Sequence, residues 1–89
     1  MNEFSMILRD ALVNEAHIGL AVRMLNKGLP RKEFIQIMAD RIRGEVKDSY
    51  NYGSEENTSY DKLIGAVLRR VDFEGIAAIL YIEAAEARK

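Results

Sequence analysis

A chain of 89 residues is long enough for one small domain, and without cysteine it has no disulfide or zinc thiolate to stabilise it. The formal net charge of −1 argues against a general DNA-binding protein, because such proteins usually carry a basic excess that contacts phosphates. Hydrophobic residues make up 48% of the chain, which is generous for so small a domain. We therefore expect one domain over residues 1–89 whose apolar surplus forms a homo-oligomer interface.

The first five residues and the lengths of the apolar runs predict where the protein acts. The start, Met1-Asn2-Glu3-Phe4-Ser5, lacks the basic residues and the apolar run of a secretory signal. No stretch reaches the roughly 18 uninterrupted apolar residues of a membrane helix. These features predict a cytoplasmic protein that does not insert into a membrane.

A first helix is predicted by apolar residues at helical spacing, namely Phe4, Ile7, Ala11, Ile18, Val22 and Leu25. Between Ile18 and Leu25 the apolar face widens, as is typical of a helix that is covered on most sides. Gly28 suits the position just after this helix, and Pro30 suits the first residue of the next. The sequence Lys27-Gly28-Leu29 therefore predicts a tight joint between two helices.

A second helix is predicted from Pro30 onward by a narrower stripe of Ile35, Met38, Ile42, Val46 and Ser49. Its basic residues Arg41, Arg43 and Lys47 lie on the flanks, where we expect solvent. Residues 50–57 form a predicted loop rich in turn-forming Asn, Gly and Ser.

A final helix is predicted over roughly residues 59–88, because Thr58 and Asp61 have the spacing of a capping box. Its predicted stripe consists of Ile64, Leu68, Val71, Gly75, Ile79 and Ile82. In the alternative interpretation, Asp72 caps a break within this segment.

Together these elements predict an all-α protein, an antiparallel helical hairpin with an additional N-terminal helix, assembled as a homo-oligomer. Four glycines fall inside the helical pattern, and each costs about 1 kcal/mol against alanine. They are Gly19, Gly44, Gly65 and Gly75. Such costs predict close helix–helix approach or contact with a ligand.

Residues for catalysis are missing from the pattern. His17 is the only histidine, and its apolar neighbours favour a packed or surface side chain over a general base. No phosphate-binding glycine motif occurs, and no mixture of ligands typical of a metal site is present. We therefore expect no catalytic residue, no metal and no cofactor, and we interpret the chain as a binding protein.

Three basic clusters are candidates for holding an anion, and for the third, Arg41-Ile42-Arg43, we expect a solvated helix flank instead. Arg23 and Lys27 are four residues apart, so they share a helix face beside Gly28 and the next helix N-terminus, whose dipole attracts phosphate. The alternative is that they only stabilise the end of their own helix. In the second cluster, Arg69 and Arg70 point about 100° apart, so one could face inward and grip a phosphate with its planar fork. The alternative is a surface arginine that pairs with a nearby carboxylate.

Two segments, Ile18–Gly28 and Arg70–Gly75, resemble the phage anti-CBASS cyclic-oligonucleotide sponges and their anti-Thoeris relatives. The two segments contain 17 of the 89 residues, about a fifth of the chain. The resemblance implies a helical hairpin that assembles into homo-oligomers, typically hexamers, and traps cyclic signalling nucleotides. It also implies that Lys27 contacts phosphate and that Arg70 faces the ligand. In the family an aromatic residue stacks on a base; the matching position here is Leu12, and Phe4 is the nearby aromatic candidate.

We thus expect a non-enzymatic sponge for cyclic dinucleotides or oligonucleotides that antagonises bacterial anti-phage signalling, in the host cytoplasm if phage-encoded. Its expected ligand contacts are Phe4, Arg23, Lys27, Gly28, Arg69 and Arg70. The alternative is a small regulator that docks a partner protein on the apolar face Leu20–Leu25. A DNA-binding helical domain is a third hypothesis, against which the acidic balance argues.

Overall fold

The computed structural model describes residues 2–50 and 58–88, which form five α-helices and no strand. The helices are α1 (Glu3–Leu12), α2 (Glu15–Asn26), α3 (Arg31–Tyr50), α4 (Thr58–Arg69) and α5 (Phe73–Ala87). The predicted all-α class is therefore confirmed for the described residues. The predicted loop lies outside them from residue 51 to residue 57, as do the side chains of the predicted Thr58–Asp61 capping box.

The stretch that predicted a single N-terminal helix contains two helices, separated at Asn14. The Oδ1 atom of Asn14 accepts a hydrogen bond of 2.9 Å from the backbone N–H of His17 and so caps α2. Its Nδ2 atom donates a hydrogen bond of 3.0 Å to the carbonyl of Ala11 in the last turn of α1. The prediction of one helix was wrong because Ala11 and Ile18 are seven residues apart, close to two full turns, so the apolar spacing continues across the break.

The final helical segment is divided at Arg70–Asp72 into α4 and α5. The backbone N–H groups of residues 70 and 71 bond to carbonyls three residues earlier, so the last turn of α4 tightens and the helix ends. Asp72 then caps α5, because its Oδ1 atom accepts a hydrogen bond of 2.9 Å from the N–H of Gly75. Of the two interpretations of this segment, the break at Asp72 is confirmed and the continuous helix is wrong.

The joint between α2 and α3 has the predicted chemistry. Gly28 adopts a φ of 82°, in the left-handed region that residues with a side chain rarely adopt, and its N–H bonds to the carbonyl of Leu25 at 2.9 Å. The carbonyl of Pro30 accepts the first helical hydrogen bond from Phe34, also at 2.9 Å. Pro30 therefore lies immediately before α3, one residue from its predicted place.

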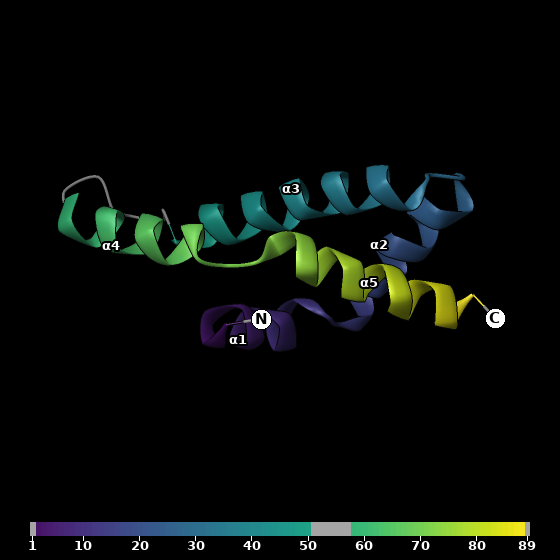
Figure 1. The fold of residues 1–89 in the computed structure, drawn as a ribbon, viewed down its shortest axis with the longest axis horizontal. Helices are drawn as coiled ribbons and strands as arrows, with labels where there is room; N and C mark the ends of the chain where they lie inside the picture. Colours follow the sequence, from purple (N-terminus) through teal and green to yellow (C-terminus); the bar gives the residue numbers. More distant parts are fainter. Residues whose placement is uncertain (1, 51–57, 89) are drawn as a thin grey trace.

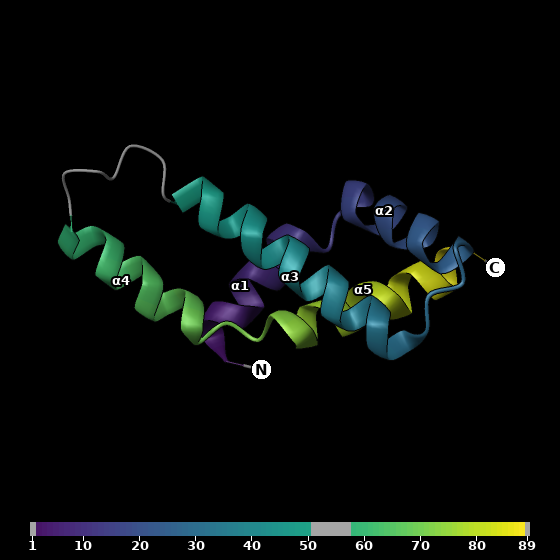
Figure 2. The same cartoon turned by 90° about the horizontal axis from the view of Figure 1, so that it is seen from above.

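The five helices form an elongated molecule with extents of 47 × 23 × 22 Å. Helix α3 runs along most of its length, and α4 followed by α5 returns beside it in the opposite direction (Figures 1 and 2). Helix α5 packs against α3, α2 and α1, which makes it the central element. No helix in the described parts of the chain is both long and apolar enough to cross a membrane.

The core is formed mainly by side chains of α2, α3 and α5. Its largest fully buried hydrophobic side chains are Phe34, Phe73, Met38, Ile42, Ile76 and Leu80. The predicted stripe on α3 is confirmed at Met38, Ile42 and Val46, whereas Ser49 is exposed. The face of α2 around Ala21, Met24 and Leu25 is also buried, so it faces the core of the same chain.

On α5 the predicted apolar stripe has the wrong phase. The buried positions are Phe73, Ile76, Ala77, Leu80 and Ala84. Ile82, which the continuous stripe would bury, is instead 56% exposed. The break at residues 70–72 restarts the helical register, so the phase extended from α4 no longer applies to α5.

Candidate anion-binding site

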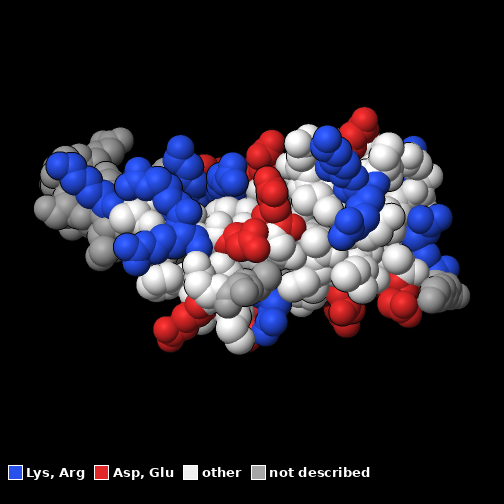
Figure 3. Space-filling view, viewed as in Figure 1, with Lys and Arg blue, Asp and Glu red and all other residues white. Residues whose placement is uncertain are grey.

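A hollow of about 440 Å³ lies between the second half of α3 and the end of α4. It is lined by Arg43, Lys47, Gly65, Leu68, Arg69 and Val71, and we call it the basic hollow. Figure 3 shows Lys and Arg side chains gathered over α4 and the neighbouring end of α3. The described residues that line the basic hollow include three cationic side chains and no carboxylate.

Helical spacing explains why the cationic side chains meet there. Arg43 and Lys47 are four residues apart and therefore share one face of α3. Gly65 and Arg69 are likewise four apart on α4. Packing of α3 against α4 brings the two faces together, with Leu68 and the buried Val71 as an apolar floor.

The guanidinium of Arg43 is partly held in place by two neighbours. Its Cζ atom lies 5.4 Å from the centre of the Phe73 ring, within the range of a cation–π contact. Its Nη1 atom is 3.6 Å from a carboxylate oxygen of Asp40, a pair that solvent screens because both side chains are more than half exposed. Lys47 and Arg69 form no ion pair with a described residue.

Gly65 keeps part of the basic hollow open. A Cβ atom built at this position would meet nothing within 4 Å, and the same is true at Gly19 and Gly44. For these three helical glycines the predicted close helix–helix approach is therefore wrong. Only Gly65 among them lines the basic hollow, where the missing side chain leaves room beside the cations.

The chemistry of the basic hollow suits binding of an anion. Two arginines offer planar forks of N–H donors that match phosphate oxygens, and a lysine adds a point charge. The apolar floor of Leu68 and Val71 can cover one face of a flat ring. The described lining residues include no histidine, carboxylate or hydroxyl group. In the described parts of the chain, no group of three His, Asp or Glu side chains is placed to hold a metal ion.

Two of the predicted ligand contacts, Phe4 and Arg70, line a second and smaller hollow of about 220 Å³ between α1 and α4. Ala66 and Val67 complete its lining. Arg70 is exposed, as is Arg69, so neither arginine of the predicted pair faces the core. The structure thus places Phe4 with Arg70, and it places Arg69 with the lysine and arginine of α3.

The other predicted contacts, Arg23, Lys27 and Gly28, lie at the α2–α3 joint, at the opposite end of the molecule from α4 (Figure 1). Arg23 and Lys27 are exposed and form no ion pair with a described residue. The guanidinium of Arg31, in the first turn of α3, lies 5.9 Å from the centre of the Tyr81 ring. The joint is therefore separate from both hollows.

Sequence reasoning assigned Arg43 and Lys47 to solvated flanks of their helix and so did not group them with Arg69 as candidate ligand contacts. Both side chains are exposed, as that assignment predicts, but they also face the end of α4 across the basic hollow. Their meeting with Arg69 depends on how α3 packs against α4, and no local pattern in the sequence contains that information. The chain matches no protein-family model, no curated protein and no solved structure to a significant degree.

Proposed function

We propose that this chain is a non-enzymatic binding protein that captures a cyclic dinucleotide or oligonucleotide through its phosphates. The observation that carries the proposal is the basic hollow, in which Arg43, Lys47 and Arg69 surround an apolar floor and no described lining residue is a carboxylate. Three cations exceed the need of a single phosphodiester and suit a ligand with two. The cyclic class of nucleotide follows from the sequence resemblance described above.

Capture would depend on binding free energy alone, so the ligand would be held and returned unchanged. A charge-assisted hydrogen bond contributes roughly 1.5–3 kcal/mol, and each 1.4 kcal/mol changes a dissociation constant about tenfold. Two or three such contacts, with a ring covering the apolar floor, are sufficient for micromolar binding or better. Acting in the cytoplasm, such a protein would lower the free concentration of a signalling nucleotide and so oppose anti-phage immunity.

The proposal includes a homo-oligomer built from the antiparallel pair formed by α3 and α4–α5, with a hexamer as the form that the resemblance implies. Support comes from large apolar side chains that the single chain leaves exposed, namely Phe4, Met6, Ile7, Ile37 and Ile82. Light scattering at micromolar concentration tests this part, since a mass equal to the 10.1 kDa monomer would exclude it.

The second candidate function is a regulator that docks a partner protein. The docking face predicted from the sequence, Leu20–Leu25, includes Ala21, Met24 and Leu25. These three side chains are buried against other helices of the same chain. A docking surface would instead lie on α1, where Phe4, Met6 and Ile7 are between 40% and 61% exposed. Such a protein would need no anion, so it would bind its partner equally well after loss of the charges in the basic hollow.

The experiment that separates the two functions is equilibrium dialysis of the purified protein against labelled cyclic dinucleotides. We expect saturable uptake that weakens with added salt, because phosphate contacts are screened. Denaturing the complex should release the nucleotide chemically intact. Failure to take up any cyclic nucleotide at micromolar protein would overturn the proposal, and release of a hydrolysed product would show an enzyme.

A further inference from the structure

Helix α5 is apolar around its whole circumference over its first half. From Gly75 to Ile82 it contains no charged or amide side chain. A helix of this kind is usually covered on every side, because its uncovered apolar side chains would otherwise stay in contact with water. In the single chain only one side of α5 is fully covered, and the side chains buried there are Phe73, Ile76, Ala77, Leu80 and Ala84.

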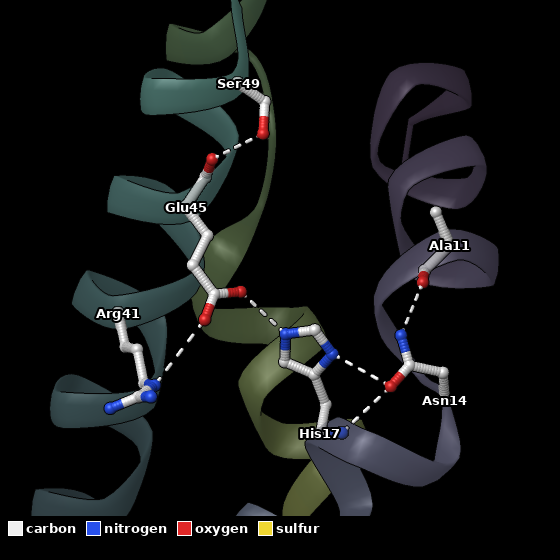
Figure 4. A network of polar contacts seen from close by, with 6 residues as sticks. All are labelled: Ala11, Asn14, His17, Arg41, Glu45 and Ser49. Carbon is white, nitrogen blue, oxygen red and sulfur yellow. Dashed lines mark hydrogen bonds and ion pairs between the residues drawn. The ribbon is translucent and has the colours of Figure 1, made fainter.

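The buried side of α5 is covered by helices of the same chain. Helices α2 and α3 both pack against it, and a polar contact joins these two helices to each other (Figure 4). The Nε2 atom of His17 on α2 lies 2.7 Å from a carboxylate oxygen of Glu45 on α3. This side of α5 is therefore closed without a second protein.

The opposite side of α5 is left uncovered between two flanks. On one flank the Tyr81 ring packs against Phe34 of α3, with 5.2 Å between the ring centres. On the other flank Ile79 lines a hollow with Val13, at the end of α1. Between the flanks lies a face that we call the outer face of α5. Its residues recur at spacings of three and four, as in the seam of two paired helices, and they are Gly75, Ala78, Ile82 and Ala85.

Ile82 projects from the middle of the outer face and is 56% exposed. The other three residues of the face are small and partly exposed. A second helix could therefore approach α5 closely on both sides of the Ile82 side chain. The face itself carries no charge, so solvation of polar groups does not oppose its burial.

The whole molecule exposes more surface than a compact protein of its mass. Its accessible surface is 6160 Å², whereas about 5,300 Å² is expected for a folded monomer of 10.1 kDa. Its radius of gyration is 14.1 Å, compared with about 12 Å for a compact domain of this length. The surplus of about 900 Å² is close to the roughly 800 Å² that each partner contributes to an interface of standard size. One such interface would therefore remove it.

We propose that the outer face of α5 is the surface on which a second copy of this chain docks, with the two α5 helices antiparallel across a two-fold axis. In such an interface each contact between two different residues occurs twice. An axis level with Leu80 places Ile82 against the partner's Ala78, so that a large side chain meets a small one. The same axis places Ala85 against the partner's Gly75.

The charges near the ends of α5 are compatible with this arrangement. Glu74 in the first turn and Arg88 at the C-cap are close to four turns apart and so lie on the same flank of the helix. Antiparallel pairing brings the acidic residue of one copy toward the basic residue of the other. An anionic lipid surface fits the outer face less well, because the residues of α5 include three carboxylates and no Lys or Arg.

This inference rests on the homo-oligomer of the proposed function and names one of its interfaces, but it does not involve the nucleotide. The test is sedimentation equilibrium, without nucleotide, of the wild type, Ile82→Gln and Ile37→Gln. Ile37 is the matched control, because it is 48% exposed on α3, outside the outer face. Ile82→Gln should raise the dissociation constant for self-association roughly tenfold to hundredfold, since the axis places the substitution in the interface twice. Ile37→Gln should associate as the wild type does, and circular dichroism should show unchanged helicity in both variants.

A second measurement uses the absence of cysteine from the chain. In the proposed pairing residue 78 of one copy lies opposite residue 82 of the other. An equimolar mixture of Ala78→Cys and Ile82→Cys should therefore form disulfide-linked dimers under mild oxidation faster than either variant does alone. Cross-linking of the mixture at the rate of the single variants would overturn the pairing.

The outcomes separate this inference from the proposed function. A monomeric wild type would overturn the docking surface together with the homo-oligomer. A wild type that assembles, with equal association of Ile82→Gln, would overturn the docking surface alone. Because the basic hollow lies within one chain, Ile82→Gln should still take up a cyclic dinucleotide in dialysis. Failure of the wild type to take up the nucleotide would overturn the capture function and leave the docking surface standing.

Discussion

The hydroxyl of Ser5 accepts a hydrogen bond of 2.7 Å from the backbone N–H of Asp72, 67 residues later in the chain. Ser5 is fully buried, and it is the one polar residue among the buried residues that the structure describes. The bond fixes the start of α1 to the place where α4 ends and α5 begins. It therefore holds α1 beside α4, where Phe4 and Arg70 line the smaller hollow.

Replacing Ser5 by alanine should lower the free energy of unfolding by about 1–3 kcal/mol, because the N–H of Asp72 loses its partner in a partly buried place. Urea denaturation measures this loss. Ser49→Ala is the control, since Ser49 is exposed and its hydroxyl only donates to a carbonyl of its own helix. A loss for Ser5→Ala no larger than for Ser49→Ala would show that the buried bond contributes little.

Asp72→Ala should cost about 0.5–2 kcal/mol, because the N-cap of α5 loses the oxygen that accepts from the Gly75 N–H. Asp72→Asn should retain most of the stability, since asparagine caps helices as well as aspartate does. Denaturation followed by circular dichroism distinguishes the two variants. If Asp72→Asn is as damaging as Asp72→Ala, the carboxylate charge matters rather than the cap.

Leu80→Ala should cost about 2–5 kcal/mol, since Leu80 is fully buried against the other helices. Ile82→Ala, two residues later, should change the stability of the single folded chain by no more than about 0.5 kcal/mol because its side chain is mostly exposed there, and any larger loss should depend on protein concentration, as expected if the proposed oligomer covers Ile82. Denaturant midpoints of the two variants measure the difference. Equal losses would mean that α5 has the register of the continuous stripe and not the one described here.

Local chemistry in the sequence predicted those parts of the fold that depend on single residues. Gly28 was expected at a helix end because few other residues tolerate a positive φ, and it has one. Asp72 was one predicted start of a helix, because the oxygen of its short side chain can accept a hydrogen bond from an N–H group of the first turn. Asn14 carries an equally good capping signal that was overlooked, because the apolar spacing from Ala11 to Ile18 stays close to helical phase across the break.

The register of α5 and the neighbours of Arg69 depend on tertiary packing, which the local sequence does not determine. Whether α5 buries Leu80 or Ile82 depends on a register that restarts after Asp72, and a break of unknown geometry erases the earlier phase. The candidate site was predicted only in part, because its residues come from two helices that are distant in the sequence. Arg69 was expected to contact a ligand, but its neighbours Arg43 and Lys47 come from a helix far away in the sequence.

Gly65→Ala and Gly19→Ala should each raise the free energy of unfolding by roughly 0.4–1 kcal/mol, because alanine favours a helix and the added methyl meets nothing within 4 Å. Only Gly65 lines the basic hollow, so only Gly65→Ala should also weaken capture of a cyclic dinucleotide, by several fold. Denaturation measures the change in stability, and equilibrium dialysis measures the change in affinity for the cyclic dinucleotide. Unchanged capture by both variants would show that the ligand does not enter the space beside Gly65.

The most direct test of the proposed function compares the affinity of Lys47→Ala and Lys27→Ala for a cyclic dinucleotide. Both lysines are exposed and carry the same charge, but only Lys47 lines the basic hollow, whereas Lys27 lies at the α2–α3 joint. Lys47→Ala should bind the cyclic dinucleotide roughly tenfold to hundredfold more weakly than the wild type, because it loses one charge-assisted contact. Lys27→Ala should bind with nearly wild-type affinity. Loss of binding in Lys27→Ala with intact binding in Lys47→Ala would contradict the account and place the ligand at the joint.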